Sequence, residues 1–194
     1  MKAFRCLVGL RHPPRAVAAA IRDLMPEVAP SLEHVEAIDT IARVDHPDGA
    51  ASLVNAWRVN PALPPALSTV LSRDKMGWLD HADWSSDLAA CRWRIEPNFM
   101  DEAIDCQGVT RFEPAMGGRG ARVTFEGQLD IDPAALCAIP LAWRGPASLA
   151  VEMLIGTIIP KNFRKTAEAI SVLLDAGSAH QRTMMEAQPG IGQG

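Results

Sequence analysis

In Arg122-Val123-Thr124-Phe125-Glu126-Gly127-Gln128-Leu129-Asp130-Ile131, every second residue is apolar. Successive side chains of a strand point to opposite faces, so this pattern predicts a strand over Ala121–Ile131 with one buried and one solvated face. A half-buried sheet needs a cover, and the chain offers a long helical pattern over Ala147–Ala176. Its apolar and small residues recur at spacings of four and three, which places them in one stripe along a helix face. They are Leu149, Met153, Gly156, Pro160, Phe163, Ala167, Ile170 and Leu174.

Composition predicts one folded domain and excludes some classes of protein. The chain has 194 residues, of which 48% are hydrophobic and 22% charged, and its formal net charge is -4. That length is enough to bury a core without metals or disulfides. Nucleic-acid binding usually requires a basic bias or a basic stripe, so no nucleic-acid partner is expected. We expect a single domain over residues 1–188 and a flexible, glycine-rich tail over residues 189–194.

Cysteine usage and hydropathy bear on the compartment. The start of the chain lacks the apolar core of a signal peptide, and no two cysteines form a CxxC pair. We therefore expect reduced, mostly buried thiols in the cytoplasm, with one disulfide as the alternative. The longest apolar run, Leu149–Ile159, is too short to span a bilayer, so no transmembrane segment is expected. The cysteines are Cys6, Cys91, Cys106 and Cys137.

The remaining chain predicts further strands and two short helices. Pro13-Pro14 favours a helix start, since the first amides of a helix need no partner within it. His46-Pro47-Asp48-Gly49 has the composition of a turn and predicts a hairpin. Strands are expected at Phe4–Leu10, Val35–Val44, Ser52–Val59, Gly77–Trp84, Ala89–Ile95 and Ala103–Glu113, helices at Arg15–Leu24 and Ala66–Leu71, and a turn at Gly117–Gly120. Hairpin-linked strands in series favour an antiparallel sheet.

This order of elements resembles the START-like superfamily, the helix-grip fold of polyketide cyclases, plant pathogenesis-related proteins and lipid-transfer domains. The resemblance lies in the first strand followed by Pro13-Pro14, the Pro47-Asp48-Gly49 hairpin, and the strand-to-helix ending from Arg122 to Leu174. It implies an α+β fold with a curved antiparallel sheet of about six to seven strands wrapped around a long C-terminal helix. It also implies a deep apolar cavity between sheet and helix. The superfamily shares no catalytic residues, so none is assigned to this chain.

Aromatic residues are the first candidates for lining that cavity. Rigid indole rings hold apolar ligands at low entropic cost and offer one N–H donor each. The alternative is that the rings simply fill the space between sheet and helix. The predicted ligand-binding residues are Trp57, Trp78, Trp93, Phe125, Glu152, Met153 and Phe163, with Trp143 as a further indole that could line the cavity.

Glu152 is included because it lies in the apolar run Leu149–Ile155. A buried carboxyl there would have a raised pKa or a basic partner, which is typical of functional residues. The alternative is a side chain that reaches solvent or a nearby arginine. Three functions follow: binding of a small hydrophobic or amphipathic ligand, a cyclase- or hydrolase-like enzyme with Glu152 or another buried carboxylate as general base, and an interaction protein with a filled core.

The long helical pattern carries three further features. Val151, Leu154, Ile155 and Ile158 extend its apolar surface beyond one stripe, which predicts a homodimer contact or packing under the Pro133–Pro146 loop. Pro160 predicts a kink, which would be either a hinge over the cavity or a boundary between two helices. Lys161, Arg164 and Lys165 form a basic group that suits a solvated helix face or, alternatively, an anionic head group.

No metal or cofactor is expected from the motifs. The five histidines are widely separated and show no HxH or HExxH spacing. Asp80-His81-Ala82-Asp83 holds three residues of ligand type, but on a strand-to-turn segment it is interpreted as polar surface, with metal binding as the alternative.

Overall fold

A seven-stranded antiparallel sheet forms the body of the protein, with strand order β1-β7-β6-β5-β4-β3-β2. The computed structural model describes residues 1–60, 77–98, 101–132, 134–135 and 161–178. The strands are β1 (Lys2–Leu10), β2 (Val35–Asp45), β3 (Ala51–Val59), β4 (Gly77–Trp84), β5 (Ala90–Pro97), β6 (Ile104–Ala115) and β7 (Gly120–Ile131). Every neighbouring pair is antiparallel, which confirms the predicted sheet.

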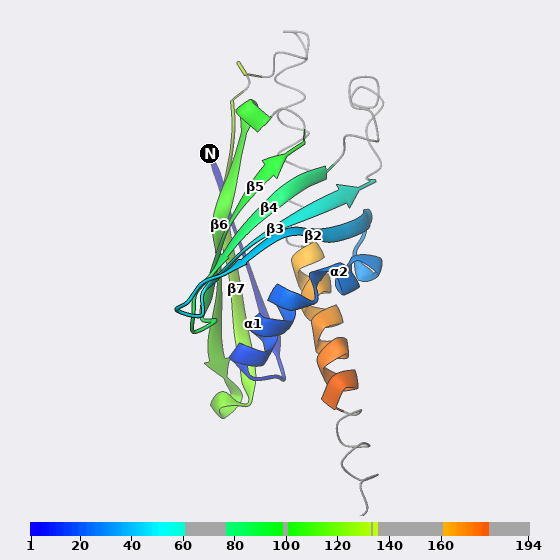
Figure 1. The fold of residues 1–194 in the computed structure, drawn as a ribbon, viewed down its shortest axis with the longest axis vertical. Coiled ribbons are helices and arrows are strands. Elements are labelled where there is room, and N and C mark those ends of the chain that lie inside the picture. The colour runs from blue at the N-terminus through cyan, green and yellow to red at the C-terminus, as the bar shows by residue number, and fades with distance from the viewer. Residues whose placement is uncertain (61–76, 99–100, 133, 136–160, 179–194) are drawn as a thin grey trace, which may run out of the picture.

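The helices lie on one side of the curved sheet, on the face that we call concave (Figure 1). They are α1 (Pro14–Asp23), α2 (Met25–Val28) and the helix of residues 161–178, drawn in orange; a short 3-10 turn, η1 (Ala29–Ser31), follows α2. Pro14 occupies the first turn of α1, where its missing N–H costs no hydrogen bond. This arrangement confirms the helix-grip architecture that the sequence predicts.

Two clusters of buried apolar residues join the sheet to these helices. In the first, Val17 and Ala18 of α1 and Ala167 of helix 161–178 pack against strand residues such as Trp84 and Val123. In the second, Ile170 packs with α2, η1 and strand residues that include Ile38 and Trp57. Ile170 and Val17 are fully buried. The predicted stripe is confirmed where the helix is described, because Phe163, Ala167, Ile170 and Leu174 all belong to these clusters.

The predicted elements and the observed ones agree within a few residues at each end. The largest differences are at the start of β1, which begins at Lys2, and at the ends of β5 and β6, which continue to Pro97 and Ala115. The turns at Pro47-Asp48-Gly49 and Gly117–Gly120 are also present, with Gly49 at φ 89°. The expected helix at Ala66–Leu71, the first part of the long helical pattern with Pro160, and the tail at 189–194 lie outside the described residues.

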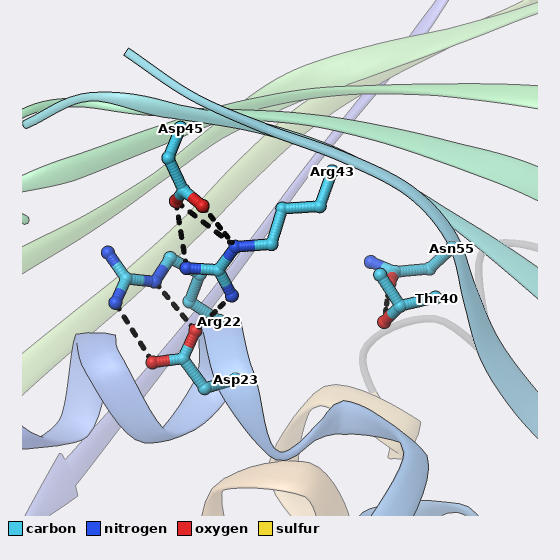
Figure 2. Close-up of polar contacts among 6 residues, drawn as sticks. All are labelled: Arg22, Asp23, Thr40, Arg43, Asp45 and Asn55. Carbon is cyan, nitrogen blue, oxygen red and sulfur yellow. Dashed lines mark hydrogen bonds and ion pairs between the residues drawn. The ribbon is translucent and has the colours of Figure 1, made fainter. Parts of the chain in front are cut away.

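An exposed ion network ties the end of α1 to the edge strand β2 (Figure 2). Arg43 Nη1 donates to Asp23 Oδ1 at 2.9 Å, and its Nη2 donates to Asp45 Oδ1 at 2.9 Å. Arg22 Nε donates to Asp23 Oδ1 at 2.8 Å. The hydrogen bond from Arg22, aided by Arg43, holds the pKa of Asp23 below its ordinary value. Such exposed pairs contribute little stability, but they link the C-terminal end of α1 to β2.

The described cysteines, Cys6, Cys91 and Cys106, are all buried. Burial raises the pKa of Cys106 to about 12 and raises that of Cys91 further, so both stay protonated at neutral pH. None of the described helices has the length and hydropathy that crossing a membrane requires.

Candidate functional site

Asp80 brings a carboxyl group onto the concave face in the middle of an apolar row. Side chains alternate along β4, so Trp78, Asp80, Ala82 and Trp84 share one face, and Ala82 and Trp84 are buried in the core. Asp80 pairs with Asn55 of β3 on one side and with Ile95 of β5 on the other. Its strand neighbours on the concave face are therefore the Asn55 amide and, among the described residues, apolar or aromatic side chains such as Trp78, Ala82 and Ile95.

A short polar chain leads from β2 to this carboxyl. Thr40 Oγ1 donates a hydrogen bond of 2.8 Å to Asn55 Oδ1, as Figure 2 shows. The oxygen of the buried Asn55 amide is thereby occupied, and its N–H groups are left for the carboxylate of Asp80. Hydrogen bonding from Asn55 does lower the pKa of Asp80, but burial has the larger effect and raises it to about 6.

Two buried indole N–H groups of the concave face lack satisfactory partners among the described residues. Among the described residues, Trp57 Nε1 and Trp93 Nε1 form no hydrogen bond of acceptable geometry. Trp57 stacks on Trp78 with ring centroids 5.2 Å apart. Its N–H also lowers the pKa of Asp80, so it lies within reach of the carboxylate, though not in hydrogen-bonding geometry. Buried indole N–H groups usually have an acceptor, so both are open positions for one.

Trp93 lies flat against the sheet because two facing glycines leave room for it. A Cβ on Gly108 would lie 2.4 Å from Trp93 Cζ2, and a Cβ on Gly127 would lie 2.5 Å from Trp93 Cη2. Gly108 and Gly127 are register partners on β6 and β7. A side chain at either position would push the indole off the sheet.

From Trp93, aromatic contacts continue to the helix. Trp93 and Phe125 stack with centroids 4.7 Å apart, and Phe125 and Phe163 stack at 4.8 Å. Phe4 of β1 joins the same group, 6.1 Å from Trp93. Aromatic rings thus form a continuous wall from the edge strand to helix 161–178.

Of the predicted ligand-binding residues, five fall within the described chain and all contribute to the concave side: Trp57, Trp78, Trp93, Phe125 and Phe163. The structure brings them together as two groups, Trp57 with Trp78, and Trp93 with Phe125 and Phe163. Glu152, Met153 and Trp143 lie outside the described residues. The charged residue that the sequence interpretation missed is Asp80.

The interpretation of Asp80-His81-Ala82-Asp83 as polar surface is right for His81 and Asp83 and wrong for Asp80. His81 Nε2 lies 3.0 Å from Glu96 Oε2, and Asp83 accepts a hydrogen bond of 2.7 Å from Ser52 Oγ. Strand alternation sends Asp80 to the opposite face from both. The alternation Trp78, Asp80, Ala82, Trp84 was the signal that could have revealed it.

The basic group on the helix is largely neutralised within the protein. Lys161 Nζ lies 2.5 Å from Glu33 Oε2, and Lys165 Nζ lies 2.8 Å from Glu33 Oε1. Hydrogen bonds from Lys161 and Lys165 lower the pKa of Glu33 to about 2. Of the three charges, only Arg164 has no carboxylate partner among the described residues. The contacts favour the solvated-face interpretation over an anionic head group.

A metal site and a separate surface depression are the two alternatives to the concave face. Within the described ranges, no three His, Cys, Asp or Glu side chains come together in a way that would hold a metal ion. A depression of about 300 Å³ is lined by Ala3, Phe4, Arg5, Glu126 and Gly127. It opens broadly to solvent at the β1–β7 edge and does not enclose a ligand, so the concave face remains the candidate site.

Solved structures share this architecture over nearly the whole chain. A protein of Thermus thermophilus is 19% identical with a TM-score of 0.63, covering 89% of this chain and 99% of its own. The Zhui aromatase/cyclase of Streptomyces sp. R1128 is 12% identical with a TM-score of 0.57, covering 94% and 95%. The chain has the helix-grip fold of the START-like superfamily.

A plant enzyme shows the same START-like fold. Norcoclaurine synthase of Thalictrum flavum, in complex with dopamine and hydroxybenzaldehyde, is 13% identical with a TM-score of 0.56, covering 89% of this chain and 86% of its own. No protein-family model matches the chain, and no curated protein does. At these identities the likeness extends to the START-like fold, and the function must be argued from the concave face itself.

Proposed function

We propose that this protein binds a small hydrophobic or amphipathic ligand on the concave face of its sheet, next to helix 161–178. The observation that carries the proposal is a pair of buried indole N–H groups: Trp93 Nε1, in the aromatic wall, has no partner among the described residues, and Trp57 Nε1 lies near Asp80 without hydrogen-bonding geometry. A core that only filled space would lose about 1–3 kcal/mol for each such donor. A ligand with apolar surface and one or two acceptors would satisfy both the wall and the donors.

The structural neighbours support the same class of function. Two of them are an aromatase/cyclase and a norcoclaurine synthase, the second in complex with dopamine and hydroxybenzaldehyde. A protein of this fold thus binds small organic molecules. The aromatic lining of Trp93, Phe125 and Phe163 gives this chain a surface of suitable chemistry.

An enzyme that uses the same face is the second candidate, and Asp80 is the observation in its favour. A carboxyl with a pKa of about 6 can both accept and donate a proton near neutral pH. Acid–base chemistry commonly needs a second group, and the described thiols of Cys91 and Cys106 are held protonated by their raised pKa. Binding is therefore the stronger proposal.

Compartment and assembly follow from other features. The buried free thiols of Cys91 and Cys106 suit a reducing compartment, which supports a cytoplasmic location. The proposed homodimer contact involves Val151 to Ile158, outside the described residues, and stays a prediction that sedimentation at micromolar concentration would test.

Indole NMR tests the binding proposal directly. We expect 2-(2-naphthyl)ethanol, a neutral apolar probe, to shift the Nε1–H signals of Trp57 and Trp93 in a saturable way. Trp84 stacks on Phe112 within the α1 side of the core and provides the internal control, whose signal should stay in place. Single Trp→Phe variants assign the signals. Equal shifts of all indoles, or none at millimolar probe, would contradict binding on this face.

A further inference from the structure

The Asp80 carboxyl needs more than an apolar ligand can offer. An ionised carboxylate has about four lone-pair positions for hydrogen bonds. The described residues offer it the Asn55 amide and the poorly placed N–H of Trp57. As far as the described residues show, acceptor capacity of Asp80 remains open.

No cation of the described chain forms an ion pair with Asp80. Two basic side chains of the described residues on the helix side are engaged elsewhere: Arg43 with Asp23 and Asp45, and Lys165 with Glu33. His81 is the neighbour whose positive charge, when present, favours ionisation of Asp80, but it lies on the opposite face and pairs with Glu96. A carboxylate that is desolvated by its surroundings and has no cation beside it destabilises the folded protein.

The surroundings of Asp80 fit one class of ligand group. An ammonium would fill the open acceptor positions and neutralise the charge. The stacked rings of Trp57 and Trp78, beside the carboxyl, would add the attraction of an indole face for a cation. A hydroxyl would supply one hydrogen bond without charge, and a carboxylate ligand would be repelled.

We propose that the ligand is an apolar amine whose ammonium group pairs with Asp80, while its apolar part lies along the aromatic wall. This inference rests on the proposed binding function and specifies its ligand class. Asp80 is the anchor, Thr40 and Asn55 orient it, and the Trp57–Trp78 pair flanks the charge.

The inference implies a pH dependence. Ammonium binding needs the carboxylate form, so affinity should fall as the pH drops below about 6, the pKa of Asp80. His81 is a further titratable group near it, and it lies on the opposite face of β4, paired with Glu96. The thiols of Cys91 and Cys106 stay neutral, and the part of helix 161–178 that packs on the sheet presents Phe163, Ala167 and Ile170.

Three matched probes test the inference on the full chain: 2-(2-naphthyl)ethylamine, 2-(2-naphthyl)ethanol and 2-naphthylacetate. At pH 7.5 we expect the amine to bind about tenfold more tightly than the alcohol, and the acetate to bind more weakly than both. Asp80→Asn should remove the advantage of the amine and change the alcohol's affinity less than threefold. Asp83→Asn, on the same strand but on the solvated face, should change neither.

The outcomes separate this inference from the proposed function. Equal affinities for amine and alcohol, unaffected by Asp80→Asn, would overturn the amine assignment and leave apolar binding standing. Failure of all three probes to shift the indole signals would overturn both. If Asp80→Asn does not fold, the wild-type comparison of amine and alcohol between pH 5 and 7.5 decides, because only the amine should lose affinity at low pH.

Discussion

Gly127→Ala is the sharpest structural perturbation of the aromatic wall. The added Cβ would lie 2.5 Å from Trp93 Cη2 and 2.6 Å from Phe4 Cζ, closer than carbon atoms approach in folded proteins. Both obstacles are the ends of rigid rings, so the methyl group displaces two aromatic side chains. At Gly108, by contrast, the Cβ would also meet the Glu126 carbonyl oxygen at 2.1 Å, and the backbone itself would have to move.

The expected change in the free energy of unfolding is the sum of opposing contributions. Overpacking a dense core by one methyl group costs about 1–3 kcal/mol. Weakening the stack between Trp93 and Phe125 costs about 0.5–1.5 kcal/mol more. Replacing glycine by alanine in a strand returns roughly 0.5–1 kcal/mol of backbone entropy. The expected net loss is about 2 kcal/mol, or roughly 4–8 °C in melting temperature for a chain of this size.

Gly9→Ala is the matched control, because a Cβ at Gly9 on β1 would have nothing within 4 Å. It keeps the entropy gain without the clash, so it should be neutral or slightly stabilising. Urea unfolding followed by far-UV circular dichroism gives the free energies, and near-UV circular dichroism reports the packing of the indoles. Gly127→Ala with the stability and near-UV spectrum of Gly9→Ala would refute the close packing of Trp93 on the sheet.

Two further predictions concern charges. Burial raises the folded-state pKa of Asp80 from 3.8 to about 6, so between these pH values the folded protein holds a proton that the unfolded chain has lost. The free energy of unfolding should therefore fall as pH rises through this window. In urea unfolding, Asp80→Asn should be more stable than wild type by up to about 3 kcal/mol at pH 7.5, with no difference near pH 4. A less stable variant at pH 7.5 would contradict this. Glu33→Gln removes the partner of Lys161 and Lys165, so amide hydrogen exchange over residues 161–165 should accelerate. Glu36 is exposed on β2 and has no such partner among the described residues, so Glu36→Gln should leave the exchange unchanged.

The fold could be predicted from the sequence because the residue patterns that indicate it are local. Alternation in β1, β6 and β7 and the turn chemistry at Gly49 depend on neighbouring residues along the chain. The stripe Phe163, Ala167, Ile170 and Leu174 likewise needs only helical spacing. The order of strands in the sheet was not predicted, because it depends on pairings such as β1 with β7 between residues far apart in the chain.

Only part of the candidate site could be predicted from the sequence. Hydrophobicity was enough to select Trp57, Trp78, Trp93, Phe125 and Phe163, but not to show that they form two groups, since that depends on strand register. Asp80 was missed because the run of polar residues around it suggested a surface, whereas its alternation with Trp78 and Ala82 indicated the concave face. The role of Gly108 and Gly127 needed coordinates, because a glycine in a strand gives no sign of which ring lies over it.

Several exceptions to local stability rules lie on one face of this sheet. Gly108 and Gly127 sit in strand interiors, where larger residues are more stable, and Asp80 interrupts an otherwise apolar row. The buried N–H groups of Trp57 and Trp93 on the same face form no hydrogen bond of acceptable geometry with the described residues. An interaction protein with a filled core would gain by replacing each of these, since its function would lie elsewhere. Their concentration on the concave face favours selection for a bound molecule there, because proteins depart from local consistency mainly where function requires it.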